Sequence, residues 1–346
     1  MDNFLIIRLS SLGDVIHTLP AFSALRKNFP EAKISWLVGK KGAEILSLVP
    51  GIDRIITVQL KKWPPLSKKF WRDFFQLKRK IKNKNQIALD FQGLIKSAFL
   101  TYISSARRRI GFHRNNLKEP FASWFYTETL DKIPEDTHIV QKNLKLLSLL
   151  GIHEEKYEFP ICFPDYLLDK TKKILSKAGY NQPKKLILFN IGATWETKRW
   201  FTENWIILIE KIKSKRFFPL ILWGNEEEKK IAEKIHLESN APLVPLLSLK
   251  EVMALIKEAA LVVSGDSFAL QAACALSRPV VSIFGPTNPK RNGPFNPRDM
   301  VAFHKLGCSY CYKRKCHYLE CLKKITPEEV ANLISKSLEE NSEYEN

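Results

Sequence analysis

Short apolar segments alternate with amphipathic segments through the first half of the chain. The apolar segments lie at 3–9, 33–39, 54–58 and 86–91. Between the first two, apolar residues recur at three- and four-residue steps through 12–28, which predicts a helix with one buried face. Pro20 falls within that segment and is expected to kink or delay the helix. The alternation predicts βαβ units and a parallel sheet.

The same alternation resumes in the second half. Its apolar segments are "KLILFN", "FPLILW", "LVVSGD" and "PVVSIFG", with helical patterns between them. The rhythm weakens at "YEFPICFPDY", residues 157–166, where two prolines bracket a short segment. We therefore expect two doubly wound α/β domains, 1–160 and 161–346, with a ligand cleft facing the carboxyl ends of both sheets.

Composition agrees with two globular domains and adds a preference for anions. The chain has 346 residues, 45% of them hydrophobic and 26% charged, and its formal net charge is +19. This charge favours nucleic acid, an acidic membrane face or a phosphorylated substrate as partner. The N-terminal segment lacks a signal-peptide pattern, and no apolar run approaches the ~18 residues of a membrane span. These features predict a cytoplasmic protein and leave contact with a membrane surface open.

Several motifs of known chemistry are absent. Neither the G-x-G-x-x-G dinucleotide motif nor the G-x-x-x-x-G-K-[ST] phosphate loop occurs, which disfavours a nicotinamide oxidoreductase. Four cysteines have the spacing C-x2-C-x4-C-x4-C, which fits a small metal knuckle but lacks the usual long interval between ligand pairs. We expect reduced thiols in preference to structural zinc or iron–sulfur at these positions, which are Cys308, Cys311, Cys316 and Cys321.

Asp14 stands where the first apolar segment gives way to the first helix. In "SSLGDVIHTLP" it directly follows Gly13, which allows close approach of a ligand. A carboxylate at such a turn is a candidate general base, or an acid that merely complements the helix dipole. The residues alone favour the second interpretation, and they favour a packing role for nearby His17.

Two turns of the second half contain groups suited to an anion. "GATWETKRW", residues 192–200, carries Thr194 and Lys198, and a hydroxyl, an ammonium and free helix amides together suit a diphosphate. "SGDSFALQAACAL", residues 264–276, opens an Ala-rich helix with Asp266 and Ser267, a second candidate for an anion or ribose. The alternatives are a solvated basic loop in the first case and ordinary helix capping in the second.

Residues 61–84 combine positive charge with aromatic side chains. They hold ten Lys or Arg and one acid, Asp73, interleaved with Trp and Phe residues. This composition fits an anionic membrane interface. Nucleic-acid binding and inward packing of the aromatics are the alternatives, although no nucleic-acid motif accompanies the stretch.

A set of motifs resembles one enzyme family along nearly the whole chain. The motifs, in order, are "RLSSLGDVIHTLPA", "LDFQGLIKSA", "RRRIGF", "KEPFASWFY", "GATWETKRW", "WGNEEE", "SGDSFALQAACAL" and "FGPTNPKRNGPF". Together they resemble a bacterial lipopolysaccharide heptosyltransferase of glycosyltransferase family 9. "KEPFASWFY" at 118–126 and "LKKW" at 60–63 resemble heptosyltransferase I more than the enzyme that adds the second heptose.

The resemblance implies two Rossmann-like domains in the GT-B arrangement, facing a central cleft. It implies that the C-terminal domain binds ADP-heptose, that the N-terminal domain binds the acceptor, and that transfer inverts the anomeric centre. No cofactor or metal is implied. The acceptor would be the 3-deoxy-manno-octulosonic acid of the lipopolysaccharide inner core, on an anionic glycolipid at the cytoplasmic face of the inner membrane. Nucleic acid would not be a partner.

The same resemblance assigns roles to individual residues, with Asp14 as the general base. The implied donor-binding residues are Thr194, Lys198, Glu228, Asp266, Ser267 and Gln271, with Glu228 at the ribose and Asp266 beside the diphosphate. The implied acceptor-binding residues are Ser11, Gly13, Lys61, Lys62, Gln92, Lys96 and Arg114, and the acceptor-side loop also includes Asp90, Gly93 and Ser97.

Two positions depart from the family pattern D-[ST]-G-x-x-H at the donor helix. Phe268 replaces the glycine and Gln271 replaces the histidine. Phe268 removes room for close backbone approach, and Gln271 cannot become cationic. The alternatives are therefore a related GT-B transferase that adds the second heptose or uses another nucleotide sugar, and a basic nucleic-acid or membrane binder without catalysis.

Overall fold

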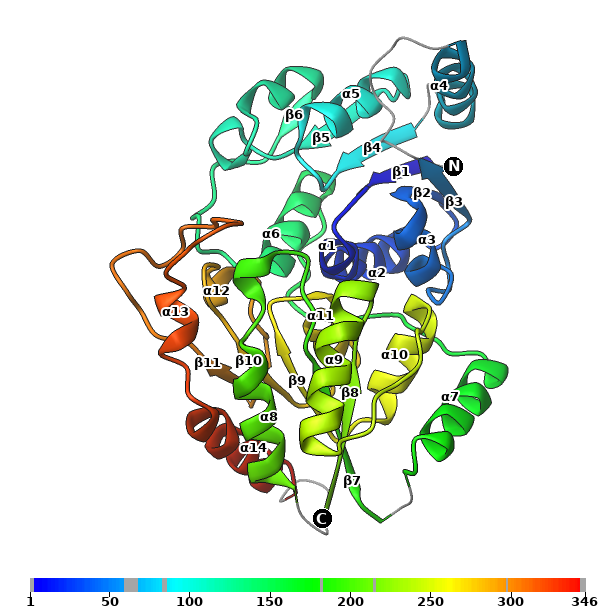
Figure 1. The fold of residues 1–346 in the computed structure, drawn as a ribbon. Helices are drawn as coiled ribbons and strands as arrows, with labels where there is room; N and C mark the ends of the chain where they lie inside the picture. The colour runs from blue at the N-terminus through cyan, green and yellow to red at the C-terminus, as the bar shows by residue number, and fades with distance from the viewer. Residues whose placement is uncertain are drawn as a thin grey trace. The chain divides into compact units, whose positions relative to one another are not determined.

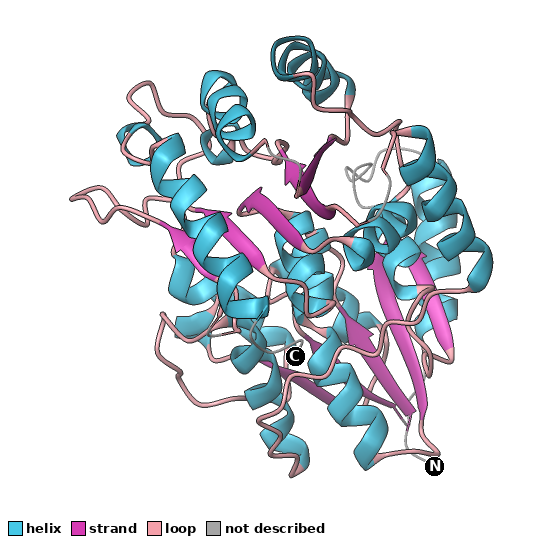
Figure 2. Ribbon diagram, turned by 90° about the horizontal axis from the view of Figure 1, so that it is seen from below, coloured by secondary structure: helices cyan, strands magenta, loops and turns pink. Residues whose placement is uncertain are grey.

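A computed structural model describes residues 3–58, 68–82, 86–180, 183–213, 216–296 and 298–342. The chain divides into two compact units, Met1–Cys162 and Phe163–Asn346. Lys61 and Lys62, two of the expected acceptor residues, lie outside the described residues. Each unit is a parallel sheet with helices on its faces, as Figures 1 and 2 show.

The N-terminal unit contains a six-stranded sheet in the order β3-β2-β1-β4-β5-β6, with every described pairing parallel. Ile7 at the end of the first strand pairs with Leu37 on one side and with Asp90 on the other. The strands are β1 (Asn3–Ile7), β2 (Lys33–Gly39), β3 (Arg54–Val58), β4 (Gln86–Asp90), β5 (Arg108–Gly111) and β6 (Glu128–Thr129).

Helices cover both faces of this sheet (Figure 1). They are α1 (Leu12–His17), α2 (Leu19–Asn28), α3 (Lys40–Leu46), α4 (Lys68–Ile81), α5 (Ile95–Ile103) and α6 (Ile139–Leu146), with short 3-10 helices η2 (Arg114–Asn116), η3 (Pro120–Phe125) and η4 (Leu147–Leu150). The segment 12–28 is broken at Thr18, and Pro20 lies in the first turn of α2, where a missing N–H costs no helical hydrogen bond. The expected effect of Pro20 is thus confirmed.

One face of the N-terminal sheet is buried under α4 and α5. Leu77 and Ile81 of α4, with Leu100 and Ile103 of α5, belong to the same buried cluster as Leu5 of β1. Burial of a large aliphatic side chain contributes about 1.5–3 kcal/mol, so this cluster fixes both helices on the sheet.

The C-terminal unit contains a five-stranded parallel sheet in the order β11-β10-β9-β7-β8. Asn190 at the end of β7 pairs with Leu222 of β8 and with Ser264 of β9. The strands are β7 (Lys185–Asn190), β8 (Phe217–Leu222), β9 (Leu261–Gly265), β10 (Val280–Ile283) and β11 (Met300–Ala302).

The C-terminal sheet is also flanked by helices on both faces (Figure 2). The helices are α7 (Asp165–Lys177), η5 (Glu196–Lys198), α8 (Thr202–Ile212), α9 (Glu226–Ser239), α10 (Leu249–Glu258), α11 (Phe268–Ala275), α12 (Pro289–Asn292), α13 (Glu320–Lys323) and α14 (Pro327–Ser342). Gly265 lets η5 lie across the end of β9, because a Cβ atom there would meet the Lys198 carbonyl oxygen at 2.7 Å. Among the described helices, none is long and apolar enough to cross a membrane.

A buried carboxyl at the start of β11 makes the stability of the C-terminal unit depend on pH. Asp299 Oδ1 accepts a hydrogen bond from the Val280 amide at 3.2 Å, while Oδ2 is buried and has no hydrogen-bond partner among the described residues. Burial raises the pKa of Asp299 from 3.8 to about 7. Between these values the folded chain holds a proton that the unfolded chain has released, so stability falls as pH rises through this window.

We expect Asp299→Asn to stabilise the protein at pH 8 by about 1–2 kcal/mol, because ionisation of the buried carboxyl no longer opposes folding. The difference should shrink towards pH 4–5, where Asp299 is protonated in the folded protein. Thermal unfolding at pH 5 and pH 8 measures this. Asp169→Asn, at a carboxylate with 67% of its side chain exposed, is the control without such pH dependence. An equal shift at both pH values would contradict the assignment.

Candidate active site

The candidate site of the N-terminal unit lies at the carboxyl end of β1, where the connections to the strands on its two sides run in opposite directions. β1 lies between β2 and β4, so the chain leaves β1 in one direction and later returns on its other side. Loops after such neighbouring strands separate and leave a crevice at their carboxyl ends, the usual position for a ligand in a doubly wound sheet. The loop that carries Asp14 follows β1, and the loop that carries Gln92 follows β4.

Asp14 lies in the first turn of α1 and is held by two residues. The Arg8 Nη2 atom lies 2.7 Å from Asp14 Oδ1. The Ser11 amide and hydroxyl donate to Oδ2 at 3.0 and 2.9 Å. One third of the Asp14 side chain, 33%, remains exposed. The carboxylate is therefore fixed in orientation and still accessible.

The pKa of Asp14 lies well below its ordinary value. Burial alone raises it, but the Arg8 guanidinium lowers it, with further contributions from His17 and the Ser11 amide. A cation within ~4–6 Å of a carboxyl group favours the charged form of that carboxyl. Asp14 is therefore ionised throughout the physiological pH range.

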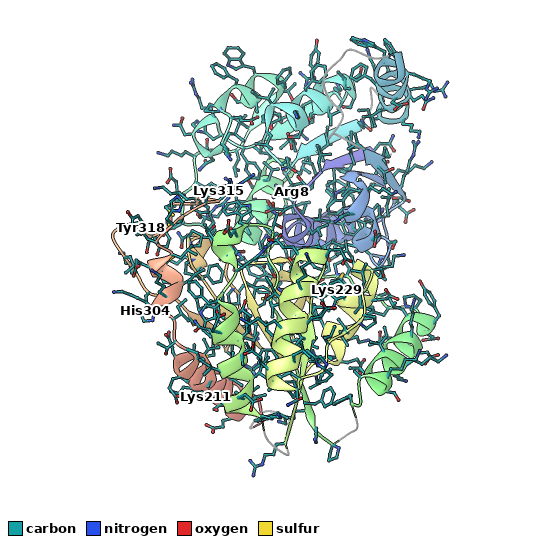
Figure 3. The ribbon with its side chains drawn as sticks, in the orientation of Figure 1. Arg8, Lys211, Lys229, His304, Lys315 and Tyr318 are labelled. Atoms are coloured by element: carbon teal, nitrogen blue, oxygen red, sulfur yellow. The ribbon has the colours of Figure 1, made fainter. Side chains whose placement is uncertain are left out.

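Arg8 is a site residue that the sequence analysis missed. It follows the last residue of β1, is 5% exposed, and also donates to the Phe91 carbonyl at the end of β4. Figure 3 labels Arg8 beside this strand end. An arginine within the apolar run "FLIIRL" was the available signal, because a buried charge is rarely retained without a partner.

Gln92 joins the two loops. Its Oε1 accepts hydrogen bonds from the Leu9 and Ser10 amides at 3.0 and 3.1 Å. The side chain thus fixes the segment that leads to Asp14. Its amide nitrogen has no hydrogen-bond partner among the described residues and is available to a ligand.

Asp90 stabilises the turn that follows β4. It is fully buried, its Oδ1 accepts from the Gln92 and Gly93 amides, and its Oδ2 accepts from the Tyr126 hydroxyl at 2.8 Å. Burial raises the pKa of Asp90, against the effect of these hydrogen bonds. The structure therefore gives Asp90 a supporting role for Gln92.

The remaining expected acceptor residues lie on nearby elements of the same unit. Gly13 is in the first turn of α1 and Lys96 in the first turn of α5, while Arg114 begins η2. Lys96 and Arg114 are exposed. Ser97 exchanges hydrogen bonds with the Leu94 backbone at the start of α5 and is buried.

His17 packs behind Asp14. It is 4% exposed, its Nδ1 lies 3.8 Å from Asp14 Oδ1, and its ring meets that of His138 edge-on at 6.0 Å between centroids. The expected packing role agrees with this position.

The C-terminal site has an ion pair at the corresponding place in its sheet. β7 lies between β8 and β9, and the loops after β7 and β9 carry Lys198 and Asp266. Lys198 Nζ lies 2.6 Å from Asp266 Oδ2, with side chains 15% and 10% exposed. The same Nζ lies 4.4 Å from the centre of the Trp195 ring, a cation–π contact.

A polar network connects the two loops below this ion pair. Asn190 Nδ2 donates to the hydroxyls of Ser264 and Ser267 at 3.0 Å and to the Gly192 carbonyl at 2.9 Å. Ser267 also caps α11 by accepting from the Ala269 amide. The sequence analysis did not single out Asn190 or Ser264, although polar residues at the ends of apolar strands were the signal.

Glu228 lies against the first of these loops. Its Oε2 accepts from the Gly224 amide at 2.8 Å, and a Cβ atom on Gly192 would meet the carboxylate at 2.3 Å. Gly192 therefore makes room for a carboxylate that is only 7% exposed. Glu228 is in the first turn of α9, capped by Asn225.

Two expected donor residues occupy different environments. Thr194 is exposed, two residues before η5 begins, whereas Thr197 within η5 is buried and donates to the Lys313 carbonyl at 2.7 Å. Gln271 is 2% exposed and its Nε2 donates to the Asn292 carbonyl at 2.7 Å, which ties α11 to α12. Phe268 is half-buried at the start of α11.

The four clustered cysteines form no disulfide bond among the described residues. Within the part of the chain that the structure describes, no three His, Cys, Asp or Glu side chains are placed to hold a metal ion. The Tyr318 and Leu319 amides lower the pKa of Cys316.

A family model of glycosyltransferase family 9, the heptosyltransferases, matches residues 74–322. Lipopolysaccharide heptosyltransferase 1 of Pseudomonas aeruginosa is 30% identical over 321 residues, which cover 91% of this chain and 87% of that protein. Lipopolysaccharide heptosyltransferase 1 of Escherichia coli O18:K1:H7 is 30% identical over 86% of this chain and 90% of that protein.

The structure of the Escherichia coli heptosyltransferase WaaC with ADP has the same fold. The TM-score is 0.79 at 24% identity, and the match covers 97% of this chain and 99% of that one. This similarity confirms the expected GT-B class of two doubly wound α/β units. With the family match and the relatives at 30% identity, it shows that the chain belongs to glycosyltransferase family 9 and is a glycosyltransferase of the lipopolysaccharide heptosyltransferase group.

Proposed function

We propose that this enzyme transfers heptose from ADP-heptose to the 3-deoxy-manno-octulosonic acid of the lipopolysaccharide inner core, with inversion and with Asp14 as general base. The observation that carries the proposal is the ionised, partly exposed Asp14 carboxylate at the switch point of the N-terminal sheet. Similarity to lipopolysaccharide heptosyltransferase 1 proteins, and to a WaaC structure with ADP-2-deoxy-2-fluoro heptose, supports the choice of donor.

The chemical step is a displacement at C1 of the heptose. Asp14 takes the proton of the attacking acceptor hydroxyl, and the oxygen of that hydroxyl forms the new bond to C1. The bond between C1 and the diphosphate oxygen breaks, and its electron pair leaves with ADP. Attack opposite the leaving group inverts the anomeric centre. Because Arg8 lowers the basicity of Asp14, the carboxylate acts through position and orientation, which Ser11 and Gln92 fix.

Charge that develops on ADP requires fixed positive groups. Lys198 is held beside the end of β9 by Asp266, and the first amides of α11 begin at the Ser267 cap. These groups stabilise the leaving diphosphate electrostatically without reorganisation. Thr194 contributes an exposed hydroxyl, and Glu228 accepts hydrogen bonds from the ribose. The role of Gln271 in donor binding remains a prediction, and its amide nitrogen already donates to the Asn292 carbonyl inside the unit.

The acceptor carries carboxylate and phosphate groups, which suit cationic side chains. Lys96 and Arg114 are exposed cations of the N-terminal unit, and the Gln92 amide nitrogen has no hydrogen-bond partner in the part of the chain that the structure describes. Lys61 and Lys62 complete the proposed acceptor set from outside the described residues. We place the enzyme on the cytoplasmic face of the inner membrane, where an anionic glycolipid acceptor is presented.

The alternative function is transfer of the second heptose, or transfer from another nucleotide sugar. It rests on Phe268 and Gln271, which depart from the family pattern at the donor helix.

We expect Asp14→Asn to reduce acceptor-dependent ADP release by about 10²–10⁴-fold, because the isosteric amide cannot take a proton. ADP release from ADP-heptose, with lipid A that bears the acid sugar, measures this; UDP- and GDP-sugars test the donor. Asp136→Asn, at an exposed acid of the same unit, should keep wild-type activity. Full activity of Asp14→Asn, or release that does not depend on the ADP sugar, would contradict the proposal.

We expect Arg8→Met to shift the acid limb of the activity profile to higher pH. Without the guanidinium, burial raises the pKa of Asp14, so the base becomes protonated and activity is lost at a pH where the wild type retains it. The measurement is kcat/KM from pH 5 to 8. Arg26→Met, which breaks an ion pair with Asp53 in the same unit, should leave the profile unchanged. An unshifted acid limb in folded Arg8→Met would exclude Asp14 as the titrating base.

We expect Lys198→Met to weaken ADP binding at least tenfold, because a charge-assisted hydrogen bond to the diphosphate is lost. Calorimetric titration with ADP measures the change. Lys211→Met is the matched control, since Lys211 forms an ion pair with Glu328 on the outer helices of the same unit (Figure 3). Equal ADP affinity in both variants would remove Lys198 from the donor site.

A further inference from the structure

A continuous row of aromatic rings runs over α4, α5 and η3 of the N-terminal unit. Trp71 contacts Phe74 and Phe75 with 6.0 Å between ring centroids, and Phe74 stacks on Phe99 of α5 at 6.3 Å. Phe99 meets Phe125 of η3 at 6.0 Å, edge-on. The row therefore joins three elements of this unit, of which α4 and α5 are labelled at the top of Figure 1.

Large parts of this row face solvent, as do Phe121 and Trp124, which lie in η3 together with Phe125 of the row. The exposed fractions are 47% for Trp71, 58% for Phe75, 55% for Tyr102, 61% for Phe121 and 78% for Trp124. The Phe121 and Trp124 rings also contact each other, 4.9 Å apart. Exposed large apolar side chains are common singly, but a contiguous group marks an interaction surface. We call these five residues the aromatic surface.

Packing inside the unit does not account for the aromatic surface. The inward sides of α4 and α5 already bury Leu77, Ile81, Leu100 and Ile103 against the sheet. Phe74 and Phe99 complete that cluster as partly buried residues. The expected inward packing of the α4 aromatics is thus right for Phe74, whereas Trp71 and Phe75 point outward.

Positive charge surrounds the aromatic surface. From Trp71 to the end of α4, four residues are Lys or Arg, namely Arg72, Lys78, Arg79 and Lys80, and one is acidic. Lys96, Arg107 and Lys118 are exposed on or beside α5 and η3. Arg109 lies 5.7 Å from the Tyr102 ring centre. Aromatic rings with cationic neighbours suit the boundary between the headgroups and acyl chains of an anionic bilayer.

We propose that the aromatic surface is the membrane-docking surface of this enzyme, with its rings inserted at the headgroup boundary of an anionic lipid bilayer. The surrounding Lys and Arg side chains bind the anionic headgroups. Docking is shallow and reversible, because insertion involves side chains of helices that are fixed on the sheet. The inference rests on the proposed function in one respect, that the acceptor is a glycolipid held in such a bilayer.

The test is co-sedimentation of the full-length protein with vesicles of phosphatidylcholine alone or with 30% phosphatidylglycerol. The wild type should bind the anionic vesicles at least tenfold more tightly, with affinity that falls as salt rises. The double variants Phe121→Ala/Trp124→Ala and Trp71→Ala/Phe75→Ala should each bind at least tenfold more weakly. Tyr166→Ala/Tyr318→Ala, which removes rings of 64% and 74% exposure from the C-terminal unit, should bind as the wild type does.

Activity separates docking from chemistry. With a deacylated, water-soluble acceptor, Phe121→Ala/Trp124→Ala should keep wild-type kcat/KM, whereas with a vesicle-embedded acceptor its activity should fall at least tenfold. Wild-type vesicle binding by both aromatic double variants would overturn the proposal, as would tight binding of an RNA oligonucleotide without vesicle binding. Failure of the proposed function has a different signature, since no sugar would be transferred to either acceptor while vesicle binding persisted.

Discussion

Burial of Arg8 at the end of the central strand β1 is the constraint on which the N-terminal site depends. A guanidinium that is 5% exposed requires hydrogen-bond acceptors, and the structure supplies the Phe91 carbonyl from β4 and the Asp14 carboxylate from α1. One buried cation therefore joins a strand end, a neighbouring loop and a helix start. The same contact keeps the Asp14 carboxylate ionised and lowers its basicity, so orientation and not proton affinity is what this site supplies.

The C-terminal unit also pairs a cation with a carboxylate at the end of its sheet. Lys198 comes from the loop after β7 and Asp266 from the loop after β9, and both side chains are mostly buried. Glycine makes this approach possible, because a side chain at 265 would collide with the Lys198 backbone. In both units a cation and a carboxylate pair at the carboxyl edge of the sheet, where a doubly wound sheet leaves room for a ligand. Both members of the pair follow β1 in the N-terminal unit, whereas they follow the neighbouring strands β7 and β9 in the C-terminal unit.

The proposed function requires that a water-soluble nucleotide sugar and a membrane-bound acceptor react on one protein. The residues proposed for the donor belong to the C-terminal unit, while the proposed base, the cations proposed for the acceptor and the aromatic surface belong to the N-terminal unit. α5 belongs to both proposed surfaces of that unit, since Lys96 lies in its first turn and Tyr102 near its end. One helix would thus hold the proposed acceptor contact and the proposed bilayer contact in a fixed relation.

The sequence by itself determined the order of strands and helices, the break near Pro20, and the turns that carry Asp14, Lys198 and Asp266, because strand and helix periodicity and turn residues are local signals. Tertiary structure decided which turns meet, since strand order depends on long-range pairing. It alone revealed Arg8 as the partner of Asp14, Asn190 as the connector of two loops, and Glu228 against Gly192. It also decided which aromatics of α4 are buried, because periodicity shows a helix's faces but not what covers them.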